Sequence, residues 1–77
     1  MLTDSFRFFQ KQLGARIQSI RKSCNLSQED VGSLLNMDRV SIGYIEQGKR
    51  APKLSTLYAM ANIFNVDIRE FFSFPKT

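Results

Sequence analysis

A chain of 77 residues holds one small domain, because folded domains usually contain about 50 to 250 residues. This length excludes a two-domain enzyme, and we expect residues 1–77 to form a single domain that association with a second copy would help to stabilise. Lys and Arg number 11 against 7 Asp and Glu, which gives a net charge of +4. That balance favours a polyanionic partner such as a nucleic acid or an anionic membrane surface.

The composition excludes several kinds of chemistry. No apolar run approaches the roughly 18 residues that span a bilayer, and no secretion signal is evident, so we expect a soluble cytoplasmic protein without a membrane partner. Cys24 is the only cysteine and histidine is absent. An internal disulfide and the usual zinc sites are therefore excluded, and we expect Cys24 to be exposed and inert rather than a redox-sensing thiol. We predict no cofactor, no metal and no catalytic residue.

The first predicted helix covers Phe6 to Ser23, where apolar residues recur at helical spacing. Its apolar positions are Phe6, Phe9, Leu13, Ile17 and Ile20. Gly14 within this helix costs about 1 kcal/mol relative to alanine. Either another backbone approaches closely there or the helix tolerates a weak point, and we expect simple tolerance.

A capping box predicts where the second helix begins. Ser27 is followed three residues later by Asp30, so a helix is expected over residues 28–35. Gly32 in this helix leaves room for a neighbouring helix. Asn36 readily adopts the left-handed backbone conformation that ends a helix, which predicts a tight turn. The apolar face of the helix consists of Val31, Leu34 and Leu35.

Asp38 is a good cap for a third helix, expected from Arg39 to Gln47 with Gly48 as its stop. Ile42 and Ile45 face inward in this interpretation. The β-branched residues of the segment also fit a strand, but no second strand is available to pair with it, so we favour the helix. Gly43 costs this helix about 1 kcal/mol relative to alanine, and either it permits a close approach of a DNA backbone or nothing in the sequence accounts for it.

Residues 49–53 form a basic loop with Pro52, which suits the start of a fourth helix. The apolar stripe of that helix is Leu54, Leu57, Tyr58, Ala61 and Phe64. The helix breaks at Asn65 or Val66, and Asp67 is placed to cap a short fifth helix. The apolar side of the fifth helix is Ile68, Phe71 and Phe72, and residues 75–77 are expected to be a flexible tail. The sequence therefore predicts five helices in one all-α domain.

Two short helices joined by the three residues 36–38 match a helix-turn-helix unit. The sequence resembles the lambda-repressor-like family of helix-turn-helix regulators, the Cro/CI or xenobiotic-response-element type, over residues 13–72. The residues that carry the resemblance are Leu26, Ser27, Gln28, Glu29, Asp30, Val31, Gly32, Met37, Asp38, Arg39, Val40, Ser41, Ile42, Ile45, Glu46, Gln47, Gly48, Lys49, Arg50, Pro52 and Leu54. The resemblance implies a five-helix domain that binds double-stranded DNA as a homodimer on a pseudo-palindromic operator, usually to repress transcription.

The resemblance also implies which residues contact DNA. Arg39 is placed either to donate two hydrogen bonds to guanine or to contact a phosphate, and Asp38 either only caps its helix or also reads a cytosine amino group. Arg21 and Glu46 match a pair that orients the recognition helix. The implied DNA contacts are Gln28, Arg39, Val40, Ser41 and Tyr44, with Gln47, Lys49, Arg50 and Lys53 gripping the phosphate backbone unless their loop is only a solvated surface.

Seven phenylalanines are too many for one small core. We expect Phe9, Phe71 and Phe72 to be buried, and Phe74 with one of Phe6 or Phe8 to be available for a contact between copies. The resembled family usually dimerises through its fifth helix, which places the interface at Phe71, Phe72 and Phe74. An alternative function is an antitoxin or another interaction module of the same fold, with an unidentified protein partner.

Overall fold

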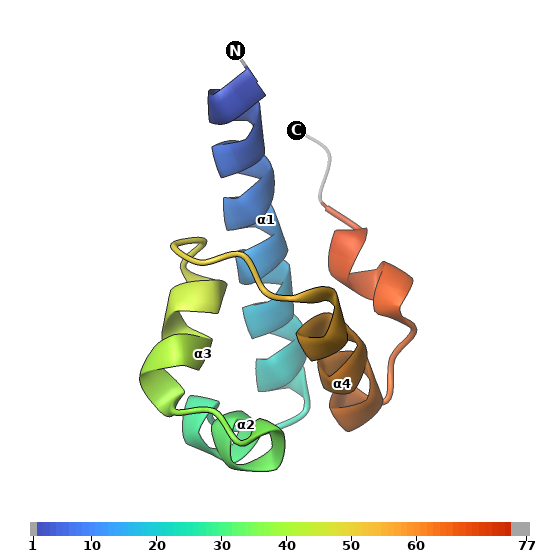
Figure 1. Ribbon diagram of the computed structural model, residues 1–77. Helices are drawn as coiled ribbons and strands as arrows, with labels where there is room; N and C mark the ends of the chain where they lie inside the picture. The colour runs from blue at the N-terminus through green and yellow to red at the C-terminus, as the bar shows by residue number, and fades with distance from the viewer. Residues whose placement is uncertain (1, 75–77) are drawn as a thin grey trace.

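The computed structural model describes residues 2–74, which form four α-helices and one 3-10 helix. These elements are α1 (Leu2–Ser23), α2 (Gln28–Leu35), α3 (Arg39–Glu46), α4 (Leu54–Phe64) and the 3-10 helix η1 (Ile68–Phe72) (Figure 1). The all-helical prediction is confirmed and the strand alternative for residues 40–45 is wrong, since α3 covers them. The predicted fifth α-helix is corrected to one 3-10 segment, and the predicted tail of residues 75–77 lies outside the described residues.

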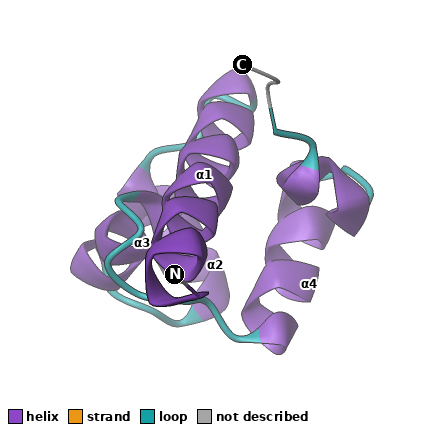
Figure 2. Ribbon diagram, turned by 90° about the horizontal axis from the view of Figure 1, so that it is seen from above, coloured by secondary structure: helices purple, strands orange, loops and turns teal. Residues whose placement is uncertain are grey.

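α1 forms the spine of the molecule. α3 lies on one side of α1, α4 with η1 lies on the other, and α2 lies near the C-terminal end of α1 between α3 and α4 (Figures 1 and 2). α1 packs against α3 and η1, while α2 packs against α3 and α4. None of the helices within residues 2–74 is long and apolar enough to cross a membrane.

Local hydrogen bonds fix the ends of the short helices. The capping box predicted before α2 is present: the Asp30 amide donates to the Ser27 hydroxyl at 2.9 Å, and the Ser27 amide donates to the Asp30 carboxylate at 2.8 Å. Asn36 ends α2 in the left-handed conformation, with φ of 57°. Asp38 caps α3, since its carboxylate accepts from the Ser41 amide at 2.7 Å. Each of these caps was predicted from residue type and spacing.

The core lies where α1 meets the other elements. Its buried members are Leu13, Ile17, Ile20, Val31, Ile42, Ile45, Leu57, Met60, Ala61, Phe64 and Phe71. Met60 was not predicted. Several residues of the predicted apolar faces are exposed instead, namely Phe6, Phe9, Leu34, Leu54, Tyr58 and Phe72, of which Phe9 and Phe72 were expected to be buried. Leu54, the first residue of α4, is the extreme case at 75% exposed.

Gly14 is a position of close backbone approach, so the expectation of simple tolerance is wrong. A Cβ atom there would collide with the carbonyl oxygens of Ile45 and Glu46, the latter at 2.6 Å. Gly32 also permits a close approach, but the partner is the carbonyl of Met37 in the turn rather than a neighbouring helix. The last turn of α3 therefore rests directly on the backbone of α1.

Cys24 is half-buried rather than exposed as expected. Its thiol lies 3.7 Å from the Phe64 carbonyl oxygen, to which it donates. The thiol thus joins the end of α1 to the end of α4.

Candidate nucleic-acid interface

α3 presents one face to the core and the opposite face to solvent. Ile42 and Ile45 are buried, whereas Val40 is 53% exposed and Tyr44 is 40% exposed. Arg39 is also exposed. The turn before α3 is held by the Met37 amide, which donates to the Gly32 carbonyl at 2.8 Å. A rigid turn therefore sets the direction in which the exposed side chains of α3 project.

Glu46 anchors the inner side of α3. It is 5% exposed and accepts from Arg21 through Nε at 2.6 Å and through Nη2 at 3.1 Å. Gln18 and Gln28 add amide donors at 3.2 Å and 3.0 Å. Arg21 also donates to the Leu26 carbonyl at 2.7 Å. One buried carboxylate, fully supplied with donors, therefore joins α1, α2 and α3.

The contact between Arg21 and Glu46 is the one that the family resemblance implied, but the two glutamines extend it. Gln18 was missed, although it lies three residues before Arg21 on the same face of α1, and that spacing was a usable signal. Gln28 was predicted to touch DNA from the start of α2. The structure places its Nε2 on Glu46 and leaves the side chain half-buried, so a DNA contact by Gln28 stays a prediction.

A group of cations lies at the C-terminal end of α3. The Nζ of Lys49 is 5.9 Å and the Cζ of Arg50 is 5.8 Å from the centre of the Tyr44 ring, within the range of cation–π attraction. Arg50 also donates to the Ser41 hydroxyl at 3.2 Å. Gln47, the C-cap residue, is exposed beside them. The structure therefore brings four of the predicted contacts, Ser41, Tyr44, Lys49 and Arg50, into one cluster.

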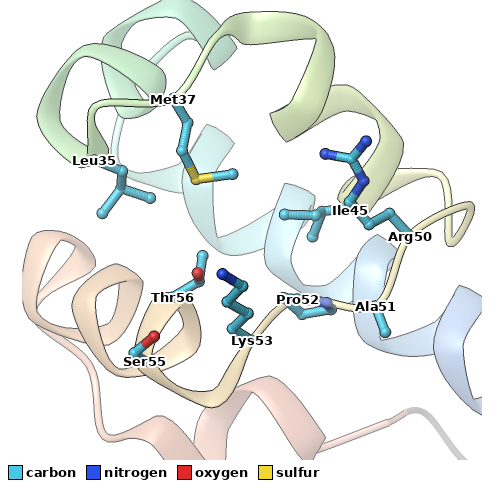
Figure 3. A pocket seen from close by; sticks show the side chains of 9 residues that line it. All are labelled: Leu35, Met37, Ile45, Arg50, Ala51, Pro52, Lys53, Ser55 and Thr56. Atoms are coloured by element: carbon cyan, nitrogen blue, oxygen red, sulfur yellow. The ribbon is translucent and has the colours of Figure 1, made fainter.

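A cleft of about 400 Å³ separates the α2–α3 turn from the start of α4 (Figure 3). It is lined by Leu35, Met37, Ile45, Arg50, Ala51, Pro52, Lys53, Ser55 and Thr56. Lys53 is the N-cap of α4 and supplies no side-chain hydrogen bond to the first turn. The amide groups at a helix start carry partial positive charge and suit an anion, and here two cations accompany them. Ser55 and Thr56 were not singled out in the sequence.

The carboxylate at the start of α3 remains ionised. The backbone and side-chain hydrogen bonds with Ser41 lower the pKa of Asp38 below its usual value, and the charge of Arg50 lowers it further. Asp30 has a lowered pKa for the same reason, through its hydrogen bonds with Ser27. Both carboxylates thus act as caps at neutral pH.

Phe71 leaves no surface for the predicted dimer contact, because it is fully buried and meets the Phe64 ring edge to face at 6.1 Å. The prediction that Phe71 forms part of the dimer interface is therefore wrong. Phe72 is 42% exposed and remains a candidate. Phe71 and Phe72 lie on η1, on the other side of α1 from α3 (Figure 2), so they form no part of the cation cluster at the end of α3.

A short helix held behind a three-residue turn, with one exposed polar face and cations at its end, defines a helix-turn-helix DNA-binding domain. Residues 17–71 match the helix-turn-helix family HTH_3. The chain therefore belongs to this family and is a DNA-binding transcriptional regulator of the Cro/CI-like type.

Two relatives and one solved structure illustrate the similarity. An uncharacterized HTH-type transcriptional regulator of Archaeoglobus fulgidus is 34% identical over 61 residues, which cover 79% of this chain and 86% of the relative. PuuR of Escherichia coli, an HTH-type transcriptional regulator, is 35% identical over 63 residues, and the match covers 82% of this chain but 34% of PuuR. The restriction-modification controller protein C.AhdI from Aeromonas hydrophila superposes with a TM-score of 0.77 at 30% identity, covering 82% of this chain and 96% of C.AhdI.

Proposed function

We propose that the protein is a homodimeric, sequence-specific repressor that binds a pseudo-palindromic operator. The observation that supports this most is the exposed face of α3, which is held rigidly from behind by Glu46 and flanked at its end by Lys49 and Arg50. A helix presented in this way enters the major groove of DNA, where base pairs differ in their donors, acceptors and methyl groups.

Arg39, in the first turn of α3, reads a guanine through two hydrogen bonds in this proposal, a contact worth about 1 to 3 kcal/mol of discrimination. Val40 meets a thymine methyl group. Tyr44 and Ser41 donate to phosphates or bases, and Gln28 adds an outer contact if its side chain leaves Glu46.

The phosphate backbone is gripped from the C-terminal end of α3. Lys49, Arg50 and Lys53 neutralise phosphates, and Gln47 donates to the backbone. The uncapped start of α4 adds its amide groups to the same task. Contacts of this kind fix the position of α3 on the duplex but read no sequence.

An exposed aromatic cluster supports the dimer. The Phe9 ring stacks on Phe72 at 6.2 Å, meets Phe74 edge to face at 5.6 Å and lies 6.3 Å from Phe6. A groove of about 290 Å³ runs beside it, lined by Phe6, Phe9, Gln10, Leu13, Ala51, Pro52, Leu57 and Phe72. Packing this cluster against a second copy would remove apolar surface from water and so stabilise a small domain.

Selection of binding sites from a random duplex library at about 0.15 M salt, followed by footprinting of the selected site, tests the DNA function. We expect a symmetric footprint with half-sites about one helical turn apart. Arg39→Ala should weaken binding and relax the preference at one base pair of each half-site. Arg69→Ala is the matched control, since Arg69 is exposed on η1 and pairs with Asp67. Enrichment of no sequence would overturn the proposal.

Sedimentation at micromolar concentration tests the dimer. Phe72→Glu and Phe74→Ala should shift the protein toward monomer, because they place a charge in the aromatic cluster or remove a ring from it. Tyr58→Glu is the control, since Tyr58 is an exposed aromatic residue of α4 outside that cluster. If both phenylalanine variants remain dimeric, the interface lies elsewhere. A reporter gene placed behind the selected site separates repression from activation.

A further inference from the structure

The N-terminal half of α1 extends beyond the rest of the helical body and passes the loop that follows α3 (Figure 1). Arg7 and Lys11 are four residues apart on α1, so they lie on the same face one turn from each other. A groove of about 600 Å³ lies between this face and the loop. Its lining residues are Arg7, Phe8, Gln10, Lys11, Gln47, Gly48 and Lys49.

The loop is fixed against α1. Gln10 donates from Nε2 to the Gly48 carbonyl at 2.8 Å. A Cβ atom at Gly48 would lie 2.7 Å from the Cα of Lys11, and φ of Gly48 is 76°, so only glycine fits this contact without strain. The cations of α1 are therefore held in a defined position relative to α3 rather than projecting from an independent arm.

The charge of this groove is unbalanced. Among its described lining residues, Arg7, Lys11 and Lys49 are cationic and none is acidic. The ion pairs found within the described part of the chain involve Arg16, Arg21 and Arg69, all outside the groove. Three cations that line one groove repel one another, and a polyanion lying across them would relieve that repulsion.

We propose that this groove is an additional binding surface for the DNA phosphate backbone, in which Arg7 and Lys11 continue the contacts that Lys49 begins. The inference rests on the proposed DNA function and extends it to a face of α1 that neither the helix-turn-helix pair nor the α3–α4 loop includes. Arg7 and Lys11 are about 6 Å apart along the helix axis, so each reaches a different phosphate.

The test uses the full chain and measures the dissociation constant of a DNA duplex as a function of salt concentration. Each lost phosphate contact lowers the steepness of the log–log plot by about 0.9, so the double variant Arg7→Gln with Lys11→Gln should lose about 1.8 units of slope for each bound protomer, or about 3.6 units for a dimer on its operator. Extrapolated from about 1 M salt, that loss weakens binding at about 0.15 M on the order of thirtyfold for one protomer and on the order of 900-fold for the dimer. The base preference of the selected site should not change.

Two controls separate a local effect from a general one. Arg69→Gln removes one charge from η1 and should keep the wild-type slope. The exchange Arg7→Lys with Lys11→Arg keeps both charges in the groove, so this variant should also show the wild-type slope. A wild-type slope for the double glutamine variant overturns the inference, as does an equal loss in the exchanged variant.

The failure of this inference and the failure of the proposed function are distinguishable. The salt series is run on both the selected duplex and a duplex of arbitrary sequence. If the wild-type protein enriches no sequence, the regulator proposal fails, while the arbitrary duplex still shows whether Arg7 and Lys11 bind phosphates. If the wild-type protein selects an operator and the double variant matches it at every salt concentration, only the groove assignment fails.

Discussion

The two faces of α3 differ in how tightly their neighbours define them. On the inner face, Ile42 and Ile45 are buried and Glu46 has a hydrogen-bond donor from each of α1 and α2. On the outer face, Arg39 and Val40 are exposed. One eight-residue helix thus combines a fixed side with a side open to a ligand. Stability and sequence preference should therefore respond to different substitutions within the same helix.

Glu46→Ala should have the largest effect among the substitutions that test this separation. Removing one partner of a buried ion pair costs about 3 to 5 kcal/mol, because the remaining charge is left without compensation. Here Arg21 would lose its carboxylate, and the amide donors of Gln18 and Gln28 would lose their acceptor. We expect a loss of unfolding free energy of about that size, measured by urea denaturation.

The matched control is Val40→Ala on the outer face, which should leave the unfolding free energy within about 0.5 kcal/mol of wild type. In DNA binding the order should reverse, so that base preference responds to Val40→Ala and not to Glu46→Ala. Glu46→Ala, studied at a temperature where it remains folded, should bind more weakly but select the same site. A changed base preference in Glu46→Ala would break the division between the faces.

A pair of glycines gives the next largest effect. A Cβ atom at Gly14 collides with the backbone of α3, whereas at Gly43 its nearest neighbours are Gln28 side-chain atoms at 3.6 Å, an ordinary contact. Gly14→Ala should therefore destabilise the fold by about 1 to 3 kcal/mol through overpacking. Gly43→Ala should be neutral or should stabilise it by up to about 1 kcal/mol, because alanine is the better helix former.

Thermal unfolding of both variants, followed by circular dichroism, checks this expectation. Each variant is the control for the other, since the chemical change is the same methyl group inside a helix. Equal melting temperatures would contradict it, because they would mean that the α1–α3 contact at Gly14 yields without cost. A melting temperature of Gly43→Ala at or above that of the wild type would show that folding does not require glycine at position 43.

The local features of this fold were predictable because each depends on residues close in sequence. Ser27 with Asp30 defined the start of α2, and Asn36 defined its end, since capping needs only side chains within a few positions. The contact of Arg21 with Glu46 was implied by family resemblance. Periodicity could not provide it, because the two residues are 25 positions apart.

The features that were missed depend on which neighbour covers which face. Phe9 and Leu54 continue the apolar patterns of their helices, yet Leu54 is 75% exposed and Phe9, although it stacks on Phe72 of η1, is still 38% exposed. Gly14 was interpreted as a weak point of the helix because the backbone that approaches it belongs to α3, which is distant in sequence. The groove between Arg7 and Lys49 was not predicted for the same reason, since its two walls are distant in sequence.

Asp38 lies at the boundary between the two faces of α3. The smallest effect that we expect is the change in unfolding free energy when Asp38 takes up a proton. Hydrogen bonds with Ser41 hold its pKa below the ordinary value of 3.8 in the folded protein. The unfolded chain therefore takes up a proton before the folded one does, so the contribution of Asp38 to stability is present above that value and is lost as the pH falls through the folded pKa.

Asp38→Asn isolates this contribution, because asparagine is also a good N-cap but does not titrate. Asp30 and Asp67, whose pKa values are also lowered, are common to both proteins and cancel in the comparison. Urea denaturation between pH 7 and pH 3 should show that the free energy of unfolding of the wild type relative to Asp38→Asn decreases as the pH falls. A difference independent of pH would mean that the cap does not depend on the charge of Asp38. The negative charge beside the exposed face of α3 would then need another explanation, such as the reading of a cytosine amino group.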